Sequence, residues 1–94
     1  MAVQVTREHG FPPESVDRLL EEAVTRAALE NGLSIVERAM RRLKVAGMGA
    51  TGEVKWDDRR ITVTANVPFA FGFVESQIRG TVEQILDRIL SVPR

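Results

Sequence analysis

The chain of 94 residues contains no cysteine and a single histidine, His9. Without cysteine it can form neither a disulfide nor a thiolate metal site, and one histidine is too few for a histidine-based metal centre within one chain. Its thirteen basic and thirteen acidic residues cancel, whereas a dedicated nucleic-acid-binding protein usually carries a basic excess. We therefore expect no metal, no cofactor and no nucleic acid among its ligands.

Long apolar runs are also missing. None approaches the ~20 residues needed to cross a bilayer, and the first residues lack the charged-then-apolar pattern of a secretion signal. We therefore expect a cytoplasmic protein. The hydrophobic content of 44% and the charged content of 28% are those of a folded domain, and residues 1–94 are short enough to form a single one. The zero net charge opposes self-association only weakly, so a homo-oligomer is one expectation.

Two segments have apolar residues at the three-and-four spacing of an amphipathic helix. The first runs from about Pro13 to Asn31, followed by Gly32, which suits a left-handed helix end. The second runs from Gly72 or the next residue to Ser91. Together with the strands described next, they predict two helices packed on one face of a sheet.

Alternating residues predict strands. A short one lies near Val3 and Val5, and another places Val54 and Trp56 on one face. The clearest strand, over residues 61–67, alternates β-branched or small apolar residues with polar ones, and a short turn makes it antiparallel to its predecessor.

The segment from Leu33 to Met48 admits two structures. Ser34 and Glu37 match a capping box, and apolar residues at 35, 36, 39, 40 and 43 would line one helical face. The alternative is a hairpin of residues 34–38 against 41–46. The local pattern slightly favours the helix.

Several short motifs have ordinary interpretations. Gly47, Gly49 and Gly52 spell a dinucleotide-binding fingerprint, but a strand follows where that motif needs a helix, so we interpret it as a turn or bulge. His9 has no evident catalytic partner, so a structural or solvent-facing role is favoured. Charged side chains that could bind phosphate or a cation are more typical of solvated surfaces; they are Arg38, Arg41, Arg42, Lys44, Arg59, Arg60, Asp57 and Asp58.

An aromatic row marks the junction between the best strand and the second helix. Phe69, Phe71 and Phe73 are three of the five aromatic residues and follow Pro68. These residues fill the core, or they form an exposed apolar surface for a partner. We take Pro68, Phe69, Phe71 and Phe73 as the candidate interaction surface.

Conspicuous segments also occur in a known order along the chain. They are Glu8-His9-Gly10-Phe11-Pro12, Asn31-Gly32, Gly49-Ala50-Thr51-Gly52-Glu53-Val54-Lys55-Trp56, Val67-Pro68-Phe69 and the helix around Gln77-Ile78. In these features, over roughly residues 5 to 90, the chain resembles the polyhydroxyalkanoic acid system family, small bacterial proteins whose genes often lie near those for polyester granule formation. The family's tryptophan-bearing strand is replaced here by Leu33-Ser34-Ile35-Val36-Glu37.

The resemblance favours the hairpin over the helix at residues 34–46. It implies an α+β fold of order β-α-β-β-β-β-α, with two amphipathic helices on one face of a small antiparallel sheet. It brings no catalytic residues, so we expect a non-enzymatic protein that binds a polyester granule, a lipid surface or a protein partner through the aromatic surface. Alternatives are a homo-oligomeric module and a binder of a small hydrophobic ligand.

Overall fold

The computed structural model describes residues 2–47, 49–66 and 72–91, with the backbone alone for 72–78. The order of elements is the expected β-α-β-β-β-β-α, and both helices end within a residue or two of the limits indicated by their apolar spacing. The elements are β1 (Ala2–Glu8), α1 (Pro13–Glu30), β2 (Ser34–Ala39), β3 (Arg42–Gly47), β4 (Ala50–Trp56), β5 (Arg60–Asn66) and α2 (Gly72–Leu90).

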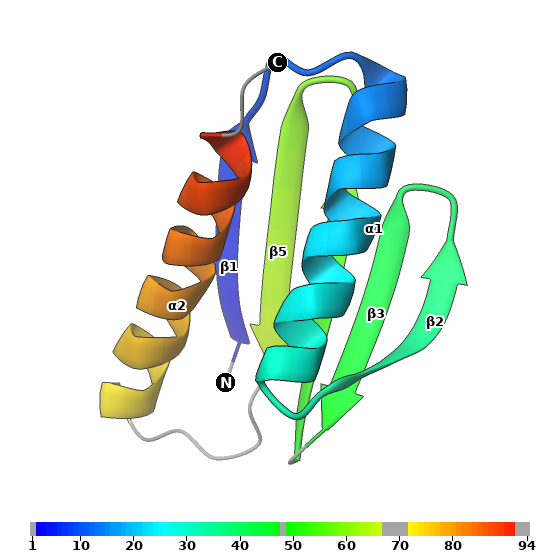
Figure 1. Cartoon of the computed structure of the whole chain (residues 1–94). Coiled ribbons are helices and arrows are strands. Elements are labelled where there is room, and N and C mark those ends of the chain that lie inside the picture. The colour runs from blue at the N-terminus through cyan, green and yellow to red at the C-terminus, as the bar shows by residue number, and fades with distance from the viewer. Residues whose placement is uncertain (1, 48, 67–71, 92–94) are drawn as a thin grey trace.

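The strands form one antiparallel sheet in the order β1-β5-β4-β3-β2. The first strand of the chain therefore pairs with β5 at one edge, while β2 forms the other edge. Both helices cover the same face of the sheet, α2 alongside β1 and α1 toward β3 and β2 (Figure 1). The molecule is thus the two-layer α+β structure that the sequence predicts.

The core lies between the helices and the sheet. One cross-strand row, Val5, Val63, Val54 and Leu43, runs across four strands through directly paired residues. Strand alternation sends these side chains to the helical side. The remaining fully or nearly buried apolar residues are Val3, Phe11, Val16, Leu20, Val24, Ala28, Trp56, Ile61, Leu86 and Ile89.

The segment 34–47 is a hairpin, so the helical interpretation is wrong. The structure splits its supposed apolar face: Val36 and Met40 are 61% and 91% exposed, whereas Leu43 is 1% exposed. Val36 lies where the pairing of β2 with β3 shifts register. Arg41 makes the tight turn with a φ of 57°, in the left-handed region that a side chain occupies only at a cost.

The glycine fingerprint falls on a second hairpin. Gly47 ends β3, Gly49 lies in the turn with a φ of 80°, and Gly52 belongs to β4. No helix begins there, so the helix N-terminus that would bind a pyrophosphate is missing at this position. Neither helix in the described part of the chain has the length and apolarity to cross a membrane.

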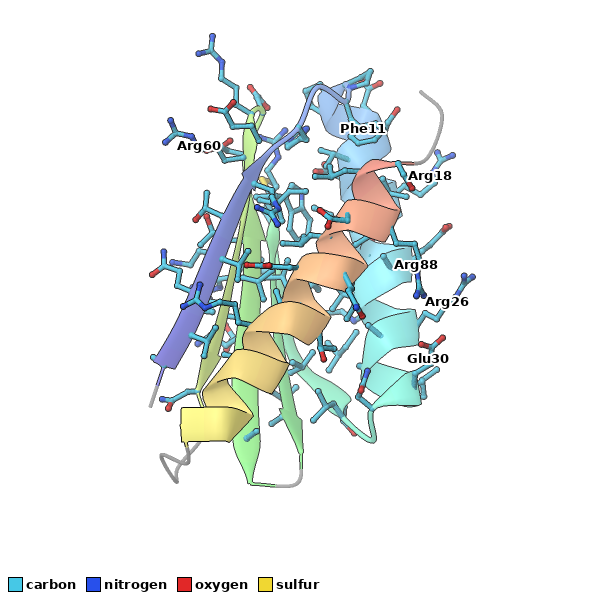
Figure 2. The ribbon with its side chains drawn as sticks, turned by 90° about the vertical axis from the view of Figure 1, so that its left-hand side faces the viewer. Phe11, Arg18, Arg26, Glu30, Arg60 and Arg88 are labelled. Carbon is cyan, nitrogen blue, oxygen red and sulfur yellow. The ribbon has the colours of Figure 1, made fainter. Side chains whose placement is uncertain are left out.

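The other face of the sheet is polar and is not covered by a helix. Glu37 contacts Arg42 at 2.6 Å and Lys44 at 3.5 Å, and Glu53 contacts Lys55 at 3.4 Å. The basic residues of this hairpin are therefore divided between the two faces of the sheet, because Arg38 and Arg41 instead contact carboxylates of α1. Figure 2 shows charged side chains pointing outward on the helical side as well, including Arg18, Arg26, Glu30 and Arg88.

Candidate functional site

The aromatic row cannot be placed as a site. Pro68, Phe69 and Phe71 lie outside the described residues, and Phe73 is described only by its backbone in α2. The interaction surface built on these four residues stays a prediction. The described residues instead form an apolar hollow that the sequence did not indicate.

That feature is a partly open apolar cavity of about 410 Å³ between the two helices and the sheet. Its floor is made by β3, β4 and β5, and its walls are α1 from Leu20 onward and α2 from Thr81 onward. It also touches Asn31 and Leu33, which follow α1. It therefore lies within the hydrophobic layer, toward the end of the molecule where α1 finishes.

Small residues in the floor explain why the cavity exists. The cross-strand row next to the filled one consists of Val3, Ala65, Gly52 and Val45, in that order across β1, β5, β4 and β3. Its two central positions carry at most one side-chain carbon each. Where the neighbouring row has Val63 and Val54, this row has Ala65 and Gly52, so the sheet does not fill the space below the helices.

Small residues on α1 continue this pattern. Ala27 and Ala28 line the cavity where longer side chains would reach the sheet, while Leu20 and Val24 bound it farther along the helix. Because residues three and four apart share a helical face, these four side chains belong to one side of α1. The small residues enlarge the cavity at one end, and the larger ones close it toward the core.

The lining offers burial and few polar contacts. The polar residues that touch the cavity are Asn31, Thr51, Glu53, Thr64 and Thr81. The carboxylate of Glu53 contacts basic side chains of the open face, and the amide nitrogen of Asn31 donates to the carbonyl oxygen of Ala27 at 2.7 Å. Among the described residues no polar or charged side chain is buried. The cavity can thus hold apolar groups, but the described lining supplies no acid–base pair to transform them.

A second hollow lies at the end of the sheet where β4 turns into β5. His9 lies against this turn: its backbone N–H donates to the carbonyl oxygen of Arg59 at 2.7 Å. Its Nε2 donates to the carbonyl oxygen of Asp57 at 2.8 Å, and its Nδ1 accepts from the backbone N–H of Phe11 at 3.2 Å. Since both ring nitrogens are engaged, His9 fastens the segment before α1 to the β4–β5 turn, which supports the structural role.

The two aspartates of that turn have different hydrogen-bond partners. Asp57 Oδ1 accepts the backbone N–H groups of Arg59 and Arg60 at 2.8 and 2.7 Å. These two hydrogen bonds hold the pKa of the Asp57 carboxyl below its usual range. Asp58 accepts from Arg41 at 3.1 Å. In the part of the chain that the structure describes, no group of three potential ligands is arranged to hold a metal ion.

The sequence signal for the cavity was present but unspecific. The sequence identifies Gly52 only as a residue of a turn region and Ala65 only as one of several alternating strand residues. Nothing local shows that they are directly paired, because that pairing depends on the register of β4 with β5. The cavity becomes visible only when both strands and both helices are in place.

Comparison with known proteins gave one family. The model of the polyhydroxyalkanoic acid system protein family matches residues 3–90, nearly the whole chain. No curated protein sequence matches. Among solved structures, the crystal structure of TTHA0849 from Thermus thermophilus is similar with 19% identity and a TM-score of 0.36, over 95% of this chain and 88% of that one.

Proposed function

The chain belongs to the polyhydroxyalkanoic acid system family, and we propose that it is a non-enzymatic protein that holds a hydrophobic ligand in the cavity between its helices and its sheet. The observation that carries this proposal is the cavity of about 410 Å³ with its apolar lining. Ligand pockets in proteins typically span about 300–1,000 Å³ and are lined mostly by hydrophobic side chains.

The size of the cavity indicates the size of the ligand. An engineered apolar cavity of about 150 Å³ accepts one benzene ring. A cavity of about 410 Å³ therefore has room for roughly two to three times as many carbon atoms, on the order of a dozen. The proposed ligand is a small lipid-like molecule or one segment of a hydrophobic polymer, which suits a family named for an aliphatic polyester.

The positions of the titratable groups support a binding role without catalysis. His9 and the aspartates beside it line the other hollow, which shares no described lining residue with the cavity. Both nitrogens of His9 are already hydrogen-bonded within the protein. General acid–base chemistry requires a free group within reach of the bound molecule, and the described cavity lining contains no such pair.

Binding of decanol, an apolar molecule of the size that the cavity indicates, tests the proposal. We expect isothermal titration calorimetry to detect binding by the folded wild-type protein, and Ala27→Trp to weaken binding by roughly tenfold, because the indole occupies space that the alcohol needs. Leu29→Trp is the matched control, since Leu29 is 76% exposed near the same end of α1. Absence of decanol binding by the folded wild type would refute the proposal, as would equal binding by Ala27→Trp.

The expected contact with a polyester granule through the aromatic row is a separate prediction. A Phe69→Ser/Phe71→Ser variant should bind granules less than the wild type if these residues form that surface. Cytoplasmic location and homo-oligomerisation likewise stay predictions.

A further inference from the structure

We propose that the ligand is a flexible aliphatic chain and that the paired residues Gly52 and Ala65 set the longest chain the cavity accepts. This inference rests on the proposed function and adds a ligand class and a specificity determinant to it. Three observations carry it: the dimensions of the cavity, the near absence of ionisable groups in its described lining, and the small residues in its floor.

The lining residues give the dimensions of the cavity. On α2 they extend from Thr81 to Ile89, and on α1 from Leu20 to Ala28. Each span covers eight residues' rise, roughly 12 Å at 1.5 Å per residue. Across the sheet the lining reaches over β3, β4 and β5, roughly 10 Å at about 4.8 Å between neighbouring strands. A cavity of these dimensions has room for a flexible aliphatic chain of about a dozen carbon atoms.

The chemistry of the lining excludes recognition of a charged group inside. Of the described lining residues, Glu53 alone is ionisable, and its carboxylate contacts Lys55 at 3.4 Å on the other face of the sheet. Affinity must then come from burying methylene groups, each worth roughly a fourfold gain in binding. The affinity should grow with chain length until the cavity is filled and then stop growing.

The floor determines where that limit falls. Gly52 and Ala65 are directly paired, with Val45 beside Gly52. A Cβ added at Gly52 would come within 3.1 Å of Val45 Cγ2 and 3.6 Å of the Thr64 carbonyl oxygen, so alanine fits there after a slight shift of Val45. Valine at Ala65 adds two carbons to the same row. Each added carbon takes the place of about one methylene of the ligand.

Straight-chain primary alcohols from hexanol to hexadecanol, with binding measured by isothermal titration calorimetry, test the inference. In the wild type, affinity should rise with length to a plateau. Ala65→Val should move that plateau to shorter alcohols and weaken the longest ones by roughly tenfold, and Gly52→Ala by roughly fourfold. Val45→Ala should move it to longer alcohols. Hexanol should bind all variants within about twofold.

Ala46→Val is the matched control, because Ala46 follows the cavity residue Val45 and so faces the open side of the sheet. It should leave the length profile unchanged. If decanol binds but affinity does not change with chain length, or changes in the same way in Ala65→Val and Val45→Ala, the chain-length inference is wrong while the proposed function stands. If the folded wild type binds no decanol, the proposed function itself fails. Circular dichroism of each variant ensures that folded proteins are compared.

Discussion

At the scale of single residues, a hydrogen bond joins the buried Trp56 to α1. Trp56 is 7% exposed, and its Nε1 donates to Asp17 Oδ1 at 2.6 Å. The same carboxylate oxygen lies 3.6 Å from Nε of Arg41, and the carbonyl oxygen of Arg41 accepts the backbone N–H of Trp56 at 3.1 Å. One aspartate thus ties the first helix to β4 and to the β2–β3 turn.

Replacing Asp17 should reveal the value of this contact. Asp17→Ala leaves the indole N–H without its acceptor in a buried position, so we expect unfolding free energy to fall by about 1–3 kcal/mol. Asp17→Asn keeps an acceptor and loses only the partly exposed ion pair, so its loss should be about 1 kcal/mol or less. Urea unfolding followed by circular dichroism measures both.

Glu21→Ala provides the comparison on the same helix. Glu21 contacts Arg38 at 3.5 Å, and both side chains are more than half exposed. Its removal should cost at most about 1 kcal/mol. If Asp17→Ala and Glu21→Ala have equal effects, the hydrogen bond to Trp56 does not contribute in the way we describe.

At the scale of elements, the turns decide the fold, and the sequence predicts some better than others. Gly32, with a φ of 71°, ends α1 as its position indicates. No glycine or asparagine marks the turn at Arg41 in the sequence, and the local pattern of residues 33–48 slightly favours a helix. Tertiary packing overrides that local pattern, because the hairpin places Leu43 and Val45 in contact with the core beneath the helices. The sequence of one segment does not reveal such contacts with other elements.

The cavity is a second feature that the local sequence pattern does not predict. Apolar spacing identifies both helices and three of the strands, because the pattern of buried and exposed positions in each of these elements is visible in its own residues. A space between elements depends on which residues become neighbours. The pairing of Gly52 with Ala65 joins residues from two strands whose register the sequence alone does not give.

The β4–β5 turn should make stability depend on pH through Asp57. Hydrogen bonds from the backbone N–H groups of Arg59 and Arg60 lower its pKa in the folded protein. A carboxyl whose pKa is lower when folded stabilises the protein above its ordinary pKa, about 4. That contribution is lost as the pH falls through the folded-state pKa.

Asp57→Asn should therefore be less stable than the wild type near neutral pH, and the two should converge on acidification below about pH 4. Urea unfolding at a series of pH values gives both profiles. Glu37→Gln should likewise weaken the dependence of stability on pH in the acidic range. The reason is that the hydrogen bond from Arg42, with the charge of Lys44, lowers the pKa of Glu37 in the folded protein. A constant gap between the wild type and Asp57→Asn at all pH values would contradict the assignment.

At the scale of the whole molecule, there is one apolar layer, and the cavity lies inside it. The open face of the sheet carries the ion pairs of Glu37 and Glu53, so the described structure has its single core between the sheet and the helices. A small domain has little buried surface to spare. We therefore expect the small residues Gly52, Ala65, Ala27 and Ala28 to lower stability, because they leave space in the core unfilled.

Filling that space should stabilise the protein in the absence of any ligand. Ala65→Val adds two carbons to the row that lines the cavity, and burial of two such groups is worth about 1–2 kcal/mol. Part of any gain reflects the general preference of strands for valine, so the increase is taken relative to Ala46→Val on the open face. Thermal and urea unfolding should both place Ala65→Val above this control. A variant that is less stable than the control would show that the row is already closely packed. If Ala65→Val is more stable than the control and accepts only shorter alcohols, the same substitution raises stability and reduces the space for a ligand. That result is expected where a core keeps room for a ligand.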